Sequence, residues 1–138
     1  LYHQAQEKKI QLKIDVDNDY WVLTNGELLE RVILNLVSNA IKYSPSNSQV
    51  LLKVRILAGS LLQVGVSDEG PGISTELASR LFKSYVRGDD SNTQKAQGIG
   101  LGLRFVDVAL RRLNSQIKFE SSSSGTLFHF SLEAIELN

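Results

Sequence analysis

The sequence contains no cysteine and no excess of either charge. The lack of cysteine excludes disulfide bonds, thiolate zinc sites and thiol nucleophiles, and it fits a cytoplasmic domain. Lysine plus arginine equals aspartate plus glutamate, at 15 each, so the net charge is zero. This balance argues against a broad binding surface for nucleic acid or anionic membranes. No apolar run approaches the length of a membrane span, and no signal-peptide pattern stands at the start.

What remains is the composition of one globular domain. Its 138 residues suit a single domain spanning residues 1–138, and 42% of them are hydrophobic. A chain of this size buries roughly two-thirds of its unfolded surface, so it can build a core. Because the first residue is Leu1 rather than Met, we expect a fragment of a longer protein, in which any membrane anchor lies outside this segment.

Hydrophobic periodicity predicts strands and helices in a mixed order. Strands are expected at residues 10–16, 20–23, 49–57, 61–67, 117–121 and 126–132. Helices are expected at residues 25–43, 75–85 and 98–113, and the polar stretch 86–97 is predicted to be a mobile loop. This order predicts an α/β (α+β) two-layer sandwich, in which a mixed sheet of about five strands carries three helices on one face.

One edge of the first long helix carries polar side chains suited to a nucleotide. Asn35, Asn39 and Lys42 fall within one narrow stripe at the helical repeat, away from the apolar stripe. An amide oxygen is a hard, neutral ligand that suits Mg²⁺, and a lysine pairs with phosphate. The alternative is that these are solvated residues on an amphipathic helix, and taken alone this stripe favours that alternative.

The chain has two glycine-rich segments, one directly after a predicted strand and one at the start of a predicted helix. Asp68 ends a strand and begins the run DEGPG, where a carboxylate can accept a hydrogen bond from an adenine amine and glycines allow close backbone approach. The alternative is a tight turn. The segment 98–102, GIGLG, is predicted to open a helix whose free N–H groups attract phosphate, or to be a flexible turn.

The polar stretch 86–97, between the second and third predicted helices, contains Arg87. A guanidinium presents a planar fork of donors that can stabilise a transferring γ-phosphate. The alternative is a surface arginine on a flexible loop, and taken alone this residue favours that alternative.

Four segments, in this order and at this spacing, resemble the conserved boxes of sensor histidine kinases. They are residues 35–45 (NLVSNAIKYSP, the N box), 68–73 (DEGPGI, the first glycine box), 81–88 (LFKSYVRG, the F box) and 98–103 (GIGLGL, the second glycine box). Residues 121–130 resemble the closing hairpin of the same family, so the likeness covers nearly the whole chain. The chain departs from the family in having Asn114-Ser115 where many relatives carry a glycine pair, and Tyr85 in place of a second Phe.

The resemblance implies the GHKL ATPase fold, shared with gyrase-type ATPases, with ATP and Mg²⁺ as cofactors. In the N box it implies Asn39 as the Mg²⁺ ligand, Asn35 as its catalytic neighbour, Lys42 on a phosphate and Tyr43 near the adenine. Asp68 would bind the adenine amine. The other residues that it places around the nucleotide are Gly70, Gly72, Ile73, Phe82, Gly98, Ile99, Gly100, Leu101 and Gly102. Residues 83–97 would be the ATP lid, from which Arg87 reaches the γ-phosphate.

Asn35 also bears on the reaction. Gyrase-type ATPases carry at this position a glutamate that activates water, and an asparagine cannot take that proton. We therefore expect transfer of the γ-phosphoryl group to a histidine on a separate dimerisation domain of the same protein, with a response regulator downstream. The fragment is expected to be a monomer and its parent a homodimer. His3 and His129 lack the context of a phosphoacceptor and are expected to be structural.

Two other functions fit the same boxes. One is a kinase that phosphorylates Ser or Thr in a partner protein, as anti-sigma-factor kinases of this superfamily do. The other is a degenerate domain that binds nucleotide only as a conformational or dimerisation module. Every box is intact, which weighs against the second of these.

Overall fold

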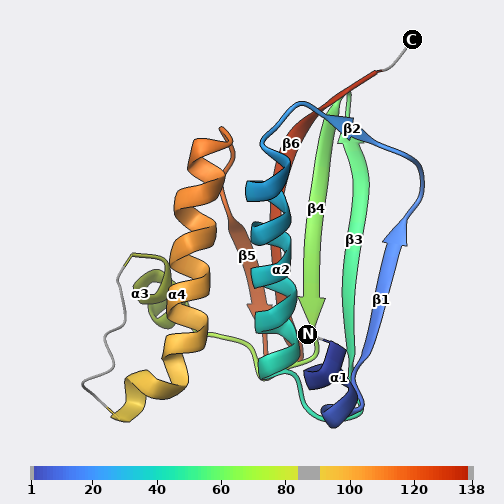
Figure 1. The fold of residues 1–138 in the computed structure, drawn as a ribbon. Coiled ribbons are helices and arrows are strands. Elements are labelled where there is room, and N and C mark those ends of the chain that lie inside the picture. Colours follow the sequence, from blue (N-terminus) through green and yellow to red (C-terminus); the bar gives the residue numbers. More distant parts are fainter. Residues whose placement is uncertain (1, 84–90, 137–138) are drawn as a thin grey trace.

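The computed structural model describes residues 2–83 and 91–136, except for the side chains of residues 2, 81, 83 and 91–101. Figure 1 shows a twisted sheet with helices α2 and α4 lying side by side over one of its faces. Among the described helices, none combines the length and the hydropathy that a bilayer crossing requires.

The described residues form four helices and six strands. The helices are α1 (Tyr2–Lys8), α2 (Gly26–Tyr43), α3 (Thr75–Lys83) and α4 (Ser91–Arg112). The strands are β1 (Gln11–Val16), β2 (Trp21–Val22), β3 (Gln49–Ala58), β4 (Leu61–Asp68), β5 (Lys118–Ser122) and β6 (Gly125–Ile135). The strand order is β1-β3-β4-β6-β2, with β5 also paired to β6; β1 is parallel to β3 and the other pairs are antiparallel. The predicted two-layer sandwich with a mixed sheet is confirmed.

Helix α2 forms where its sequence provides both caps and an apolar stripe. Either Thr24 or Asn25 suits the cap by type, and in the structure the Asn25 side chain accepts a hydrogen bond from the N–H of Leu28 at 3.1 Å. The helix ends at Tyr43, before Ser44-Pro45, because a residue that precedes proline disfavours helical geometry. The cap and the proline thus fix the length of the helix that carries the polar stripe.

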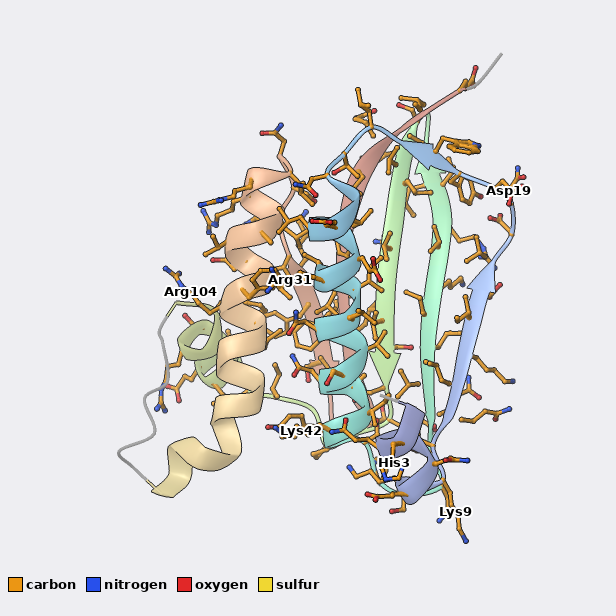
Figure 2. All side chains as sticks on the ribbon, in the orientation of Figure 1. His3, Lys9, Asp19, Arg31, Lys42 and Arg104 are labelled. Carbon is orange, nitrogen blue, oxygen red and sulfur yellow. The ribbon has the colours of Figure 1, made fainter. Side chains whose placement is uncertain are left out.

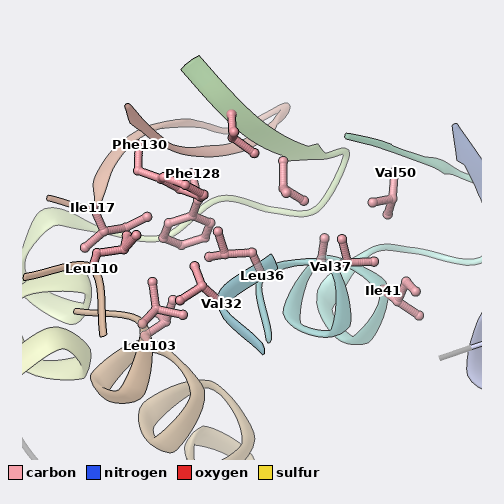
Figure 3. Close-up of a cluster of buried hydrophobic side chains, with 14 of the residues drawn as sticks. Val32, Leu36, Val37, Ile41, Val50, Leu103, Leu110, Ile117, Phe128 and Phe130 are labelled. Carbon is pink, nitrogen blue, oxygen red and sulfur yellow. The ribbon is translucent and has the colours of Figure 1, made fainter. Parts of the chain in front are cut away.

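The core lies between this helix pair and the covered face of the sheet (Figure 3). Val32 and Leu36 of α2 and Leu103 of α4 are fully buried against it. Val66 and Phe130, on the neighbouring strands β4 and β6, are each only 1% exposed. Burial of this apolar surface is the main favourable term of folding, and it holds α2 in a fixed place over the end of β4.

Strand β1 is less buried than its alternating pattern predicts. Leu12, Ile14 and Val16 share the helix-facing side of the sheet with Val50, yet Ile14 is 66% exposed and Val50 is fully buried. β1 is an edge strand, and α2 packs over β3 and β4 rather than over β1 (Figure 1). The expectation of a half-buried strand is therefore wrong for most of β1.

Two further boundaries differ from the sequence-based expectation. Residues 91–97, predicted to belong to a loop, form the first turns of α4, and residues 98–102 lie inside this helix rather than opening it. A glycine weakens a helix by about 1 kcal/mol relative to alanine but does not stop it, so the glycine cluster alone does not fix the start. Helix α1 was not predicted, because it has only seven residues and only Ala5 among its described side chains is buried.

Helix α4 ends in a left-handed cap. Asn114 has a φ of 59°. The N–H of Ser115 donates to the carbonyl of Leu110 at 2.8 Å, and the N–H of Asn114 donates to the carbonyl of Arg111 at 3.1 Å. These bonds form a Schellman motif, which glycine usually completes. Asn114 therefore serves as the cap in place of the usual glycine, because asparagine tolerates this conformation better than most residues.

We predict that Asn114→Ala lowers the free energy of unfolding by about 1 kcal/mol, because alanine is strained in the left-handed region. Asn114→Gly is the matched control and is expected to leave it unchanged or raise it. Urea unfolding at neutral pH measures both variants. Equal stability of the alanine and glycine variants would contradict this cap.

Candidate functional site

A pocket opens where α2 ends beside the loop that follows β4. It encloses about 430 Å³ of empty space when the open solvent at its mouth is included. Its wall is formed by the last turns of α2, the run 68–73 and strand β6. The lining residues are Asn39, Tyr43, Asp68, Gly70, Pro71, Gly72, Ile73, Thr126 and Phe128. Predicted site residues from the N box and from the first glycine box, distant in sequence, therefore meet in one cavity.

Asn39 is the polar residue of α2 in this wall. The residue is 7% exposed, and within the described part of the chain its Nδ2 atom is buried without a hydrogen-bond partner. A buried polar atom that lacks a partner costs about 1–3 kcal/mol, so such atoms are rare unless a ligand completes them. The amide therefore suits a bound group, and its oxygen is of the type that Mg²⁺ accepts.

Asn35 lies one turn earlier, between α2 and α4. Its Nδ2 atom donates to the carbonyl of Arg31 at 2.7 Å, and its Oδ1 atom lies 3.2 Å from the place that a Cβ on Gly102 would occupy. The same position is 3.4 Å from Nδ2 of Asn39. The structure thus brings both asparagines and Gly102 together.

A cation–π contact holds the two helices at this point. The guanidinium carbon of Arg31 lies 4.5 Å from the ring centroid of Phe105, and Figure 2 shows Arg31 between α2 and α4. The backbone carbonyl of the same residue accepts the hydrogen bond from the Asn35 amide.

Asp68 is the acidic group of the pocket. Its Oδ1 atom accepts a hydrogen bond from the N–H of Gly70 at 2.8 Å. Partial burial raises the pKa of Asp68, and hydrogen bonds from the backbone of Gly70 and Thr126 oppose this shift without cancelling it. A half-buried carboxylate aimed into a cavity is a strong acceptor for an N–H donor of a ligand.

The first glycine loop touches its neighbours too closely for side chains. A Cβ on Gly70 would lie 2.7 Å from the carbonyl oxygen of Tyr43, and one on Gly72 would lie 2.1 Å from that of Ser122. Gly72 also has a φ of 81°, in the region that favours glycine. The loop is therefore pressed between the end of α2 and the β5–β6 turn.

Strand β6 contributes two residues to the pocket that the sequence patterns did not predict. Thr126 is 6% exposed and lines it with Phe128. The Oγ atom of Ser121 accepts a hydrogen bond from the N–H of Ile73 at 2.7 Å and lies 3.0 Å from Oγ1 of Thr126. The likeness of residues 121–130 to the closing hairpin was the available signal, but strand pairing alone brings Thr126 opposite Asp68.

Phe82 lies behind the pocket. Its ring centroid is 6.1 Å from those of Phe119 and Phe128, so it supports Phe128 from the α3 side.

Burial raises the pKa of the Tyr43 hydroxyl, in keeping with its place in the wall. Lys42 is exposed, with Nζ 6.0 Å from the Tyr43 ring centroid, at the lower end of α2 in Figure 2.

Several predicted residues fall elsewhere. Arg87 lies outside the described residues, as do residues 84–90 of the predicted lid, while residues 91–97 of that lid belong to α4. Helix α4 contains Gly98, Ile99, Gly100 and Leu101, in the part of the helix whose side chains the structure does not describe. His129 faces the open side of the sheet, where Nδ1 lies 3.1 Å from Nε2 of Gln63 and Nε2 lies 3.5 Å from Glu120. These contacts agree with the structural role expected for His129.

Comparison with known proteins defines the class. Residues 24–136 match the family described as histidine kinase-, DNA gyrase B- and HSP90-like ATPase, and the chain belongs to this family. The fold and the family together define an ATP-binding catalytic domain of the histidine kinase type.

The similar proteins include named sensor kinases. The chain is 36% identical over 129 residues to the adaptive-response sensory kinase SasA of Rippkaea orientalis, covering 92% of this chain and 32% of that protein. It is 33% identical over 132 residues to the sensor-like histidine kinase SenX3 of Mycobacterium bovis, covering 95% and 32%. The chain thus spans about a third of the length of these relatives.

Two solved structures show the same fold. The mycobacterial sensor histidine kinase MprB has a TM-score of 0.79 at 21% identity, covering 99% of this chain and 90% of that one. Full-length ShkA, in complex with AMPPNP, has a TM-score of 0.81 at 24% identity, covering 98% of this chain and 28% of that one.

The raised pKa of Asp68 makes a prediction about stability and pH. Below the unfolded-state pKa this carboxyl is neutral in both states, and its burial then carries no charge penalty. As pH rises from about 3.8 through the higher folded-state pKa, ionisation destabilises the native state. We predict that Asp68→Asn is increasingly more stable than wild type across this window and keeps that advantage at neutral pH.

Urea unfolding between pH 3 and 7 measures this difference. The Asp19→Asn variant, at an exposed position, is the control for the change from carboxylate to amide, and it is expected to differ little from wild type in stability. A difference for Asp68→Asn that shrinks with rising pH would reverse the sign of the pKa shift and refute the burial argument.

Proposed function

We propose that this domain binds Mg-ATP in the described pocket and transfers the γ-phosphoryl group to a histidine on a separate helical domain of its parent protein. The observation that carries the proposal is the convergence of Asn39 and Asp68, from different elements, on one cavity. The proposed partners are a dimerisation domain that bears the histidine and a downstream response regulator, within a homodimeric parent.

The chemistry of the wall supports an adenine at its inner end. Asp68 offers an acceptor for the adenine amine, while Ile73 and Phe128 offer apolar surface to the ring. Gly72 lets the loop pack tightly against the β5–β6 turn, where a Cβ would lie 2.1 Å from the carbonyl oxygen of Ser122. The adenine would therefore lie across the end of β4, with the phosphates directed along α2.

The polar edge of α2 supports the phosphate end. Asn39 would hold Mg²⁺ through its amide oxygen, with Lys42 and Arg87 on phosphate oxygens. Mg²⁺, when bound, neutralises charge on the phosphate oxygens. Gly98, Gly100 and Gly102, with Ile99 and Leu101, would border the triphosphate from α4; a side chain at position 102 would meet the two asparagines.

Asn35 cannot act as a general base, and this supports phosphoryl transfer rather than hydrolysis. Its amide nitrogen is bound to the carbonyl of Arg31, so only its oxygen faces Gly102, and an amide oxygen does not remove a proton from water. In the proposed step, an imidazole nitrogen attacks the γ-phosphorus in line and ADP leaves. The described residues act by positioning the nucleotide, and Lys42 and Arg87 by offsetting charge.

We predict that Asn39→Ala weakens binding of Mg-ATP by at least about tenfold and leaves the domain as stable as wild type. The first effect follows from loss of the metal ligand, and the second from removal of a buried amide whose nitrogen has no partner in the described chain. Titration calorimetry with and without Mg²⁺ measures it, with Ser38→Ala on the same helix as the control. A loss that is equal with and without Mg²⁺ would place Asn39 in the pocket but not on the metal.

A second prediction concerns the acceptor. Mixed with Mg-ATP and the parent's histidine-bearing domain, the chain is expected to produce a phosphorylated protein whose label is lost in acid and retained in base. An acid-stable label would instead indicate a Ser or Thr kinase. Tight nucleotide binding with no label on any partner would indicate a binding module.

A further inference from the structure

The side chain of Lys8, at the end of α1, lies across the C-terminal end of α2. Its ammonium donates hydrogen bonds to the carbonyl oxygens of Ile41 at 3.1 Å, Lys42 at 2.7 Å and Ser44 at 3.0 Å. An ammonium has three donors, so these bonds use all of them. The last carbonyls of a helix have no partners inside it and form its negative end, so a cation placed there stabilises the end.

The backbone of Lys8 is fixed as well. Its carbonyl accepts a hydrogen bond from the N–H of Asn47 at 3.0 Å, and the N–H of Ile10 donates to the carbonyl of Ala5 at 2.8 Å. Lys9, between them, has a φ of 57° and turns the chain from α1 into β1. Lys8 thus connects three parts of the chain: α1, the end of α2 and the loop that leads into β3.

The helix end held by Lys8 is also a wall of the nucleotide pocket. Tyr43 and Asn39 line the pocket, and the carbonyl oxygen of Tyr43 lies 2.7 Å from where a Cβ of Gly70 would be. The carbonyl of Ala40 is taken by both the N–H and the hydroxyl of Ser44. The last turn of α2 is therefore held by Lys8 on one side and by the first glycine loop on the other.

A groove continues from α1 to the same polar edge. Gln4, Glu7 and Lys8 of α1 line it together with Asn39 and Lys42 of α2. Figure 2 shows α1, with His3 labelled, next to the end of α2 that carries Lys42. A displacement of α1 would therefore act on the turn that bears the proposed metal and phosphate ligands.

From this geometry we propose that Lys8 is a positioning residue for the nucleotide site and couples the placement of α1 to nucleotide affinity. The proposal rests on the proposed function, because it takes Mg-ATP to bind in this pocket. Without the three bonds, the last turn of α2 loosens against Gly70, and Asn39 and Tyr43 lose their fixed position relative to Asp68. The segment ahead of the sheet then controls how well the site is formed.

Substitution of Lys8 tests the coupling. Lys8→Met keeps the apolar stem and removes the charge and the donors, and we expect the Kd for Mg-ATP to rise by about fivefold or more. Lys8→Arg retains a cation with several donors and should restore most of the affinity. Lys9→Met is the matched control, since Lys9 is exposed and its ammonium contacts no described residue by a hydrogen bond or ion pair; it should bind as wild type. Calorimetry is run below the unfolding transition of every variant.

The unaltered chain provides a second measurement. Because coupling is reciprocal, saturation with Mg-ATP should slow amide exchange at Ile10 and Asn47, whose N–H groups hold α1 in place. The slowing should exceed that of the Ala134 amide by about fivefold or more. The N–H of Ala134 donates to the carbonyl of Ser60 at 2.7 Å, in a part of the sheet away from α1. This measurement decides the question even if Lys8→Met fails to fold.

The outcomes separate the two proposals. Wild-type affinity in Lys8→Met, or equal slowing at Ile10, Asn47 and Ala134, overturns the role of Lys8 and leaves the proposed function intact. No binding of Mg-ATP by the wild-type chain overturns the proposed function, and with it this inference. Weakened binding in Lys8→Met that Lys8→Arg does not restore would show a loss of packing rather than of the three bonds, and also overturns it.

Discussion

The contact between the last turn of α2 and the glycine loop after β4 sets the geometry of the pocket. The carbonyl of Tyr43 and the backbone of Gly70 approach so closely that a single methyl group would separate them. Neither partner is free to yield, because α2 is anchored by buried residues such as Leu36 and Ile41, and β4 by Val66. Close-packed interiors transmit small displacements, so the core that stabilises the fold also determines the width of the site.

The polar groups of the site lower the stability of the ligand-free domain. Asn39 buries an amide nitrogen without a partner in the described chain, and Asp68 has a raised pKa because its charge is partly removed from water. Both conditions oppose folding: a hydrogen-bond acceptor would relieve the first, and a donor or a cation the second. Ligand binding and folding stability are therefore linked, and a nucleotide that satisfies these groups stabilises the domain by mass action.

The closing hairpin shows how distant sequence completes a local site. Ser121 holds the N–H of Ile73, and Thr126 pairs across the sheet with Asp68. The register between β4 and β6 runs for eight residue pairs, from Leu61 with Glu133 to Asp68 with Thr126. A slip of one residue would turn Asp68 to the opposite face of the sheet, so the register of the whole strand pair protects one carboxylate.

Local chemistry in the sequence was sufficient for the main elements. The apolar stripe, the Asn25 cap and Ser44-Pro45 predicted the two ends of α2, and the alternation of apolar and polar residues located the strands of the sheet. The order of the boxes was sufficient for the family and for most of the pocket wall. These features depend on neighbouring residues, whose periodicity and turn chemistry are visible in the chain itself.

Only tertiary structure decided the features that depend on distant contacts. It left β1 exposed, because helix α2 covers the neighbouring strands, and it placed Gly102 inside α4, where a glycine lets the helix approach Asn35 and Asn39. It also brought Thr126 into the pocket and Lys8 onto the end of α2. The sequence determines which residues can form helices, strands and binding groups, but the packing of α2 between α4 and the sheet decides which of those groups meet, since that distance is fixed by side chains far apart in the chain.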